Sequence, residues 1–201
     1  MFSESFYRPS RQRGVTLVEL IMFIVIVAVA LAGIIGVMRL TTANSADPLR
    51  RKQALMIAEG LLEEVRAAAF TVCDPASNNA DTALAAAECQ IPEAWGQVAP
   101  EPVNPRPFDN VNDYVPRANV DTAAFDAGGV LVNAAGTALG VQGYTARVNI
   151  APAQLFGVGF GPGGATGADA NVLRIRVTVG FDAGQSVVLD GYRMRYARPG
   201  F

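Results

Sequence analysis

The sequence contains no histidine, and this absence removes the commonest general base at neutral pH and the commonest metal ligand in proteins. It also lacks an excess of basic residues, since 16 Lys and Arg stand against 18 Asp and Glu. Proteins that bind nucleic acid rely on a positive field that such a balance does not supply. We therefore expect no nucleic-acid partner, no metal and no cofactor, although carboxylate chemistry remains open.

Cysteine is scarce as well, because the chain has only Cys73 and Cys89. Their spacing is not that of a C-x-x-C pair, so neither a redox motif nor a metal site is indicated. In an oxidising compartment a disulfide between them would stabilise the fold by roughly 3 kcal/mol. In the cytosol the two thiols would stay reduced, so the compartment decides whether the disulfide forms.

The 201 residues allow one globular domain plus an extension. One long apolar run stands out near the N-terminus. Residues 20–38 carry no charge, and together with residues 15–18 they form a stretch interrupted only by Glu19. As a helix, these 24 residues would be about 36 Å long, enough to cross a hydrocarbon core of about 30 Å.

The apolar run lies on the unusual side of a possible processing site. A secretory signal places its cleavage site after the apolar run. Here Arg8, Arg11 and Arg13 lead to Gly14, and the apolar run follows that glycine and ends at Arg39. This order indicates that the apolar segment is retained in the mature protein.

Glu19 is the anomaly in this segment. A carboxylate inside a membrane span costs roughly 3 kcal/mol on insertion scales and is usually kept for a partner. The alternative is an interfacial residue that marks the membrane edge, because the first turn of a helix tolerates a carboxylate well.

The string RGVTLVELIMFIVIVAVALAG resembles the N-terminus of type IV pilins and pseudopilins. The resemblance implies that a prepilin peptidase cuts between Gly14 and Val15 and that the new Val15 amine is methylated. It also implies that Glu19 meets the terminal amine of a neighbouring subunit during assembly. Val15 departs from the family, in which this position is most often phenylalanine.

The same resemblance implies a domain order. It comprises a cleaved cytoplasmic leader, a transmembrane and filament-core helix, an amphipathic continuation of that helix, and a globular head, at residues 1–14, 15–46, 47–71 and 72–201. The implied partners are the inner membrane, the prepilin peptidase, other pilin subunits and the pilus assembly machinery.

The orientation in the membrane follows from the motif rather than from charge, because basic residues are nearly balanced on the two sides of the span. With the leader in the cytoplasm, the head lies in the periplasm of a single-pass protein and later in the filament. In that compartment a structural disulfide between Cys73 and Cys89 is favoured.

Beyond the span, Asp47-Pro48 is typical of a helix N-cap followed by proline at the first helical position. The next stretch is amphipathic, with charged residues mostly off its apolar face. That face is predicted to contain Leu55, Ala58, Leu62, Val65 and Ala69. Glu63 and Glu64 are adjacent, so their side chains diverge and form no catalytic dyad.

Three segments near the C-terminus alternate as strands do, at residues 144–150, 173–181 and 186–197. One face of the first two is predicted to carry Tyr144, Ala146, Val148, Ile150, Leu173, Ile175, Val177, Val179 and Phe181. An antiparallel sheet with one covered face is the natural outcome. The predicted fold class is α+β, pilin-like, with a long N-terminal helix packed on this sheet.

Two other motifs favour plain structural roles. Residues 159–164 read GFGPGG, but the proline and the glycine-rich sequence that follows predict a loop rather than a dinucleotide site. Asp109, Asn112 and Asp113 offer oxygens for calcium but lack the glycine and glutamate of a calcium loop. A structural turn is favoured there.

Longer phrases narrow the resemblance. SADPLRRKQALMIAEGLLEEV, AAFTVCDP, RPFDNVNDY and VVLDGYRMRYA together resemble minor pilins of the mannose-sensitive haemagglutinin type. This implies a non-enzymatic subunit that assembles into or primes a type IV pilus, in adhesion or pilus biogenesis. Two alternatives stay open, a pseudopilin of type II secretion and a single-span periplasmic binding or adhesive protein.

Overall fold

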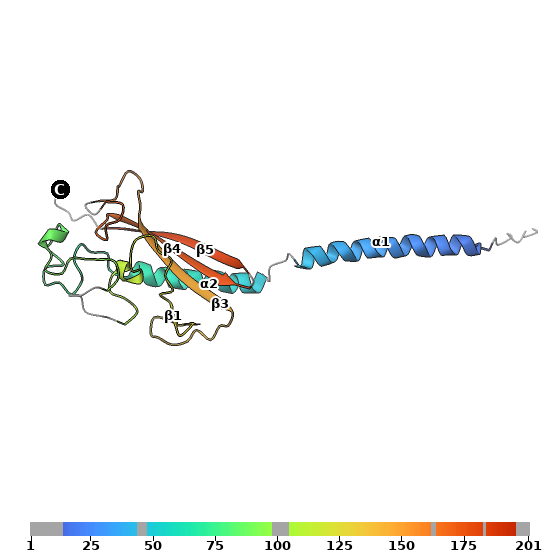
Figure 1. The fold of residues 1–201 in the computed structure, drawn as a ribbon, viewed down its shortest axis with the longest axis horizontal. Helices are drawn as coiled ribbons and strands as arrows, with labels where there is room; N and C mark the ends of the chain where they lie inside the picture. Colours follow the sequence, from blue (N-terminus) through green and yellow to red (C-terminus); the bar gives the residue numbers. More distant parts are fainter. Residues whose placement is uncertain (1–13, 44–47, 98–104, 162–163, 183, 196–201) are drawn as a thin grey trace, which may run out of the picture. The chain divides into compact units, whose positions relative to one another are not determined.

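The computed structural model describes residues 14–43, 48–97, 105–161, 164–182 and 184–195 (Figure 1). The chain divides into two units, Met1–Ala46 and Asp47–Phe201, which we call the anchor unit and the head. The predicted leader lies almost entirely outside the described residues, as does the predicted N-cap Asp47.

The anchor unit contains one helix, α1 (Leu17–Ala43). Its sequence is rich in β-branched residues, which have a slightly reduced helix propensity in water. A long helix of this composition satisfies its backbone hydrogen bonds internally and therefore suits a lipid environment. No described side chain between Leu17 and Arg39 is buried by the rest of the chain.

The head begins with α2 (Pro48–Ala67), which starts at the proline predicted for the first helical position. Its buried residues form a stripe at helical spacing, Ala54, Ala58, Leu61, Leu62 and Val65. The predicted stripe was wrong at two positions. Leu55 is 36% exposed, because its neighbour Ala54 faces the sheet instead, and Ala69 lies beyond the end of the helix.

α2 ends earlier than predicted, because the backbone that follows it forms hydrogen bonds with a distant loop. Ala69 N–H donates to the Asp109 carbonyl, and Val111 N–H donates to the Ala69 carbonyl, at 2.9 and 3.0 Å. This exchange forms an isolated parallel bridge between Ala69 and Asn110. A backbone engaged with a distant loop cannot continue the helical ladder.

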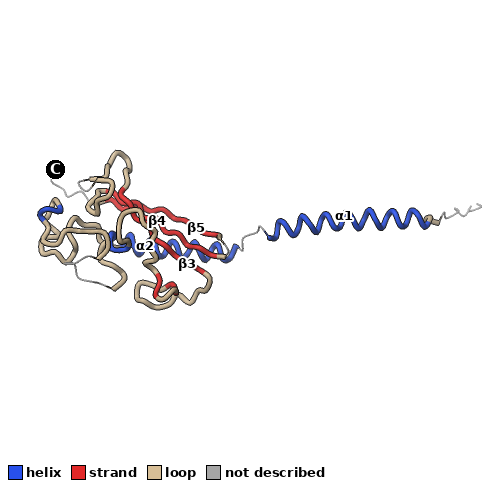
Figure 2. The backbone as a smooth tube through the Cα atoms, viewed as in Figure 1, coloured by secondary structure: helices blue, strands red, loops and turns tan. Residues whose placement is uncertain are grey.

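A three-stranded antiparallel sheet covers α2, with strand order β3-β4-β5 (Figure 2). The strands are β3 (Tyr144–Pro152), β4 (Val172–Phe181) and β5 (Gln185–Met194). The nine inward residues predicted on the first two strands are all buried, which confirms the predicted face. The structure adds the register, in which Val148 pairs with Val177. The α+β class and the helix-on-sheet packing are confirmed as well.

Close packing of α2 on β5 depends on Gly191. A Cβ built at this position would lie 3.0 Å from Leu62 Cδ1 and 3.3 Å from Arg66 Cδ. Glycine therefore lets the helix approach the strand without displacing side chains.

The remaining elements are short. They are the 3-10 turns η1 (Ala86–Glu88) and η2 (Val111–Tyr114) and the hairpin strands β1 (Asp126–Ala127) and β2 (Val130–Leu131). The hairpin turns at Gly128 and Gly129, which both have positive φ. The described part of the glycine-rich segment near residue 160 is loop, as predicted, and its residues 162–163 lie outside the description.

Candidate functional site: the N-terminal segment

Three of the described residues, Gly14, Val15 and Thr16, precede α1, and they include the predicted processing site. Gly14 has open space around the position of a Cβ, and Val15 is 71% exposed. Both are therefore accessible within the described structure. A residue without a side chain lets an enzyme approach the backbone closely, which fits the chemistry proposed for this bond.

Thr16 lies at the N-cap of α1, just before the first helical residue, and the predictions from sequence did not include it. Its hydroxyl Oγ1 accepts the backbone N–H of Glu19 at 3.3 Å, and its carbonyl accepts that of Leu20 at 3.1 Å. Threonine at an N-cap satisfies a donor that the first helical turn leaves open. The sequence signal was present, because Thr-x-x-Glu is a capping-box pattern.

Glu19 lies in the first turn of α1 and is exposed. The positive end of the helix dipole favours a carboxylate there. Its location thus agrees with both interpretations, the interfacial residue and the group kept for a partner amine. Its role in assembly stays a prediction.

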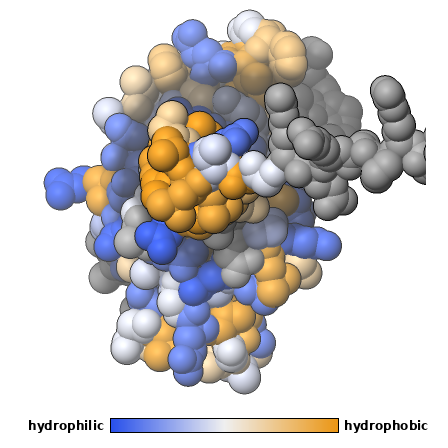
Figure 3. Space-filling view, turned by 90° about the vertical axis from the view of Figure 1, so that its right-hand side faces the viewer, coloured by the Kyte–Doolittle hydropathy of each residue, from blue (hydrophilic) through white to orange (hydrophobic). Residues whose placement is uncertain are grey.

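From Leu20 to Met38, α1 carries only apolar side chains and glycines. Figure 3 shows hydrophobic side chains, in orange, gathered over this helix. From Leu17 to Arg39 it is long and apolar enough to cross a membrane, and none of that segment is buried inside the chain. A helix that is hydrophobic all round needs an apolar environment supplied from outside.

Candidate functional site: the head

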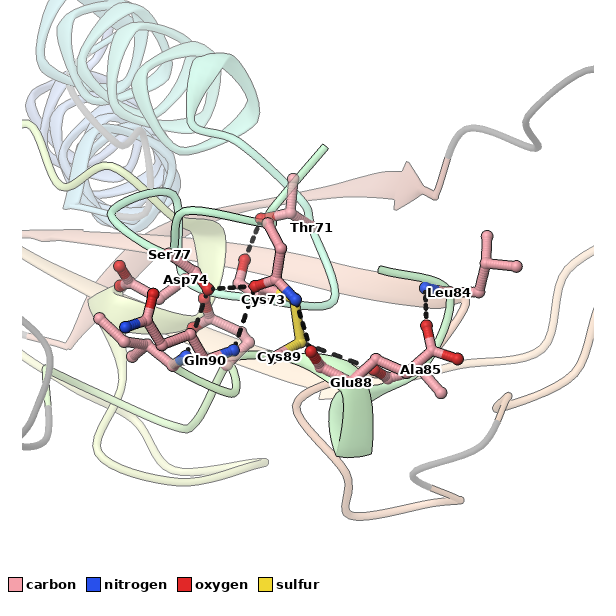
Figure 4. The surroundings of a disulfide bond; sticks show 12 residues. Thr71, Cys73, Asp74, Ser77, Leu84, Ala85, Glu88, Cys89 and Gln90 are labelled. Atoms are coloured by element: carbon pink, nitrogen blue, oxygen red, sulfur yellow. Dashed lines mark hydrogen bonds between the residues drawn. A yellow bond between two sulfur atoms is a disulfide. The ribbon is translucent and has the colours of Figure 1, made fainter. Parts of the chain in front are cut away.

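The two cysteines form a disulfide between Cys73 and Cys89 (Figure 4). The loop that it closes is held by side chains from within the loop. Asn79 donates from Nδ2 to the Glu88 carbonyl, and its Oδ1 accepts the Gln90 backbone N–H at 3.1 Å. The loop is thus a stapled and internally hydrogen-bonded unit, a feature of proteins from oxidising compartments.

A buried ion pair connects α2 to the loops beside it. Arg106 and Glu64 meet in a bidentate contact of 2.6 and 3.2 Å, with side chains 9% and 11% exposed. Arg106 also donates to the Val132 carbonyl at 2.6 Å and lies over the Phe125 ring. Glu64 was predicted on the charged side of α2, but this pair takes it into the packed interior.

Tyr114 completes this cluster. Its hydroxyl donates to Glu64 Oε1 at 3.1 Å, and its ring packs edge-on against Phe108 with 4.8 Å between centroids. Burial raises the pKa of the Tyr114 hydroxyl well above its usual range, and the nearby Glu64 carboxylate raises it further. Tyr114 and Phe108 are thus packing residues.

The candidate calcium cluster forms a structural turn. Asp113 Oδ2 accepts the Asn110 backbone N–H at 3.1 Å and so caps η2, while Asn112 donates to the Ala168 carbonyl at 2.9 Å. Asn110 also donates to Glu93 at 2.7 Å. These side chains organise the loops, which confirms the prediction of a turn.

An apolar groove of about 790 Å³ lies beside α2. Its lining includes Met56, Ile57, Gly60, Phe108 and Leu139. Sequence reasoning missed it, because three segments far apart in the chain build it. The groove belongs to the head alone.

Comparison with known families locates one match. Residues 9–35 match the family described as the prokaryotic N-terminal methylation motif. This range contains Gly14, Val15 and Glu19 and most of the apolar run. Comparison with curated proteins found no match, and comparison with solved structures found none either. The matched motif, the apolar helix and the α+β head together support a type IV pilin-like or pseudopilin-like protein.

Proposed function

We propose that the chain is a minor pilin subunit of a type IV pilus, resembling the minor pilin MshD of the mannose-sensitive haemagglutinin system. A prepilin peptidase removes residues 1–14, and the amine of Val15 is methylated. The subunit waits in the inner membrane with its head in the periplasm. It then enters the filament or primes its assembly.

The observation that carries this proposal is α1 together with its motif. The helix presents apolar side chains on every side and buries none of them within its own chain. Such a helix suits two environments in turn, the bilayer and the packed interior of a filament. The family match over residues 9–35 lies at the start of this helix.

The subunit acts by assembly rather than catalysis. When α1 leaves the bilayer, the Glu19 carboxylate and the Val15 amine of a neighbour desolvate at lower cost as a pair than alone. The pair therefore favours one register of the incoming subunit. The disulfide-stapled head supplies contacts at the filament surface.

N-terminal mass spectrometry of protein from purified membranes and pili tests the proposal. We expect a chain that begins with N-methyl-valine at Val15. A protein that retains Met1 would overturn it and would favour a single-span periplasmic binding or adhesive protein. A pseudopilin of type II secretion would share the processed terminus, and the gene neighbourhood separates it from a pilin.

The assembly role of Glu19 has its own test. We expect Glu19→Ala to be processed normally and to be strongly depleted from sheared filaments, because the Val15 amine of the neighbour loses its partner. Glu59→Ala is the matched control, since Glu59 is an exposed carboxylate on α2. Normal incorporation of Glu19→Ala would contradict the role.

A further inference from the structure

A tight turn after β3 presents an aromatic side chain to solvent. Leu155 and Val158 exchange two backbone hydrogen bonds, of 3.0 and 2.9 Å, across the two residues Phe156 and Gly157. Both central residues have positive φ, 49° at Phe156 and 81° at Gly157. This is the pattern of a type I′ turn, which favours Asn-Gly.

Phe156 is an unusual choice for this position. A bulky residue at positive φ is a conformational outlier, so the turn itself gives no reason for phenylalanine. The side chain is 93% exposed, the largest exposure among the large apolar residues of the described chain. A strained backbone that holds an aromatic ring in water points to a contact made outside the chain.

The groove beside α2 offers a receptor for such a ring. Two of its polar side chains already have partners, since Glu64 accepts from Arg106 and Tyr114. The Asn133 side-chain oxygen likewise accepts two backbone N–H groups of its own loop, at 3.0 and 2.9 Å. Apolar side chains and small residues make up most of the rest of the lining. An occupant therefore gains most by being apolar.

Phe156 does not fill the groove of its own head, because the residue is 93% exposed. The loop after β3, which carries Phe156, rises at the top of Figure 1, whereas the loop before β3, which lines the groove, lies at the bottom. Among the described residues, Phe156 does not belong to the lining of the groove. Phe156 and the groove are thus each available to a different copy of the chain.

We propose that Phe156 of one copy inserts into the groove formed by Met56, Ile57, Gly60 and Phe108 of the next copy. A contact between two different surfaces is heterologous and leaves one free surface at each end. Repetition of such a contact builds an open chain of subunits instead of a closed dimer. The inference rests on the proposed function, since it describes how neighbouring heads touch in an assembly.

The contact is weak in isolation. A phenylalanine buries about 150–250 Å², far below the roughly 1,200 Å² of a stable interface. Anchoring of α1 in a shared membrane or filament raises the effective concentration of the second surface and makes so small a contact sufficient. The heads should therefore pair in membranes and filaments but separate in dilute detergent.

Cysteine cross-linking in the full-length protein tests the pairing. Two differently tagged copies are expressed together, one with Phe156→Cys and one with Met56→Cys, and mild oxidation is applied to membranes and pili. The two native cysteines are joined to each other. We expect a mixed disulfide at several times the yield of a control pair, Leu84→Cys with Met56→Cys, because Leu84 is exposed but lies in the stapled loop. A yield equal to that control would overturn the proposal.

A second variant separates the contact from the fold. Phe156→Asn suits the turn, so we expect an equal or higher melting temperature. In assembled protein, the thiol of Met56→Cys should react with a maleimide several times faster when Phe156→Asn is also present. Leu84→Asn is the matched control and should leave that reactivity unchanged. Equal reactivity with and without Phe156→Asn would overturn the proposal.

The outcomes remain distinct from a failure of the proposed function. An unprocessed N-terminus would refute the pilin assignment and leave the cross-link informative about the heads. A processed and assembled protein without the mixed disulfide would refute only the contact. Disulfides between two copies of Phe156→Cys alone, at equal yield, would indicate a symmetric interface and would also overturn the proposal.

Discussion

The two long helices of the chain use their apolar residues in opposite ways. α1 exposes apolar side chains on all sides, whereas α2 buries one stripe against its own sheet and leaves charged residues on the other side. The packing partners of α2 are thus within the head, whereas the apolar side chains of α1 from Leu17 to Arg39 are not buried within the chain. Substitutions in α2 and its surroundings should change folding, and substitutions in α1 should change location.

The largest effect is expected in the head. Arg106→Ala leaves Glu64 buried without its cation, which should lower the free energy of unfolding by about 3–5 kcal/mol. Urea unfolding of the full-length protein in detergent, followed by the fluorescence of the single tryptophan, measures it. Arg176→Ala is the control, because its pair with Asp190 has side chains 41% and 35% exposed, and an exposed ion pair contributes little to stability. Equal losses of stability in the two variants would contradict the assignment of Arg106 and Glu64 as a buried ion pair.

A charge placed in α1 tests the same difference between the two helices. Leu31→Arg should cost about 2.5–3.5 kcal/mol on membrane insertion, and it should lower the share of protein in the membrane fraction. The urea midpoint of the head should not change. Met56→Arg places the same charge on the exposed side of α2 and serves as the control, for which we expect full membrane retention.

Tyr114 allows a test by pH. Because its pKa is raised in the folded state, its contribution to stability is fully present below the unfolded value of about 10 and is lost as pH rises from there through the higher folded value. Tyr114→Phe should lower stability near neutral pH by about 1.5–3 kcal/mol, since it removes a hydrogen bond to a charged group. The stability of this variant should also fall less steeply with pH above pH 10. The same steep fall in Tyr114→Phe would show that Tyr114 is not its cause.

The smallest effect concerns the start of α1. Thr16→Ala removes the cap on the Glu19 N–H, which should cost about 0.5–2 kcal/mol of helix stability. Hydrogen exchange in lipid nanodiscs should show faster exchange at Glu19 and Leu20 only. Thr16→Ser keeps the hydroxyl and should restore slow exchange.

Much of the sheet was predictable from sequence. Alternating residues such as Val148, Ile175 and Val177 were assigned to the correct face, because the two-residue period of a strand places them there regardless of context. The amphipathic stripe of α2 was predicted less well. A helix allows several neighbouring stripes, and the choice of Leu61 over Leu55 depended on how the sheet lies against it.

Contacts between distant segments could not be predicted. Nothing in the sequence pairs Glu64 with Arg106, since 42 residues separate them and each alone has the character of a surface residue. The groove and the exposed position of Phe156 likewise follow from the folding of loops. By contrast, Thr16 was recognisable as a cap and was overlooked.

The sequence by itself determined the local and periodic features of this protein. They are the apolar helix, the motif around Gly14 and Glu19, the alternating strands and the absence of histidine, all of which depend on residue type and short spacing. The tertiary structure alone decided which charges are buried, where α2 ends and which surfaces face outward. Those features depend on contacts between residues far apart in the chain, and the chain's folding brings those residues together.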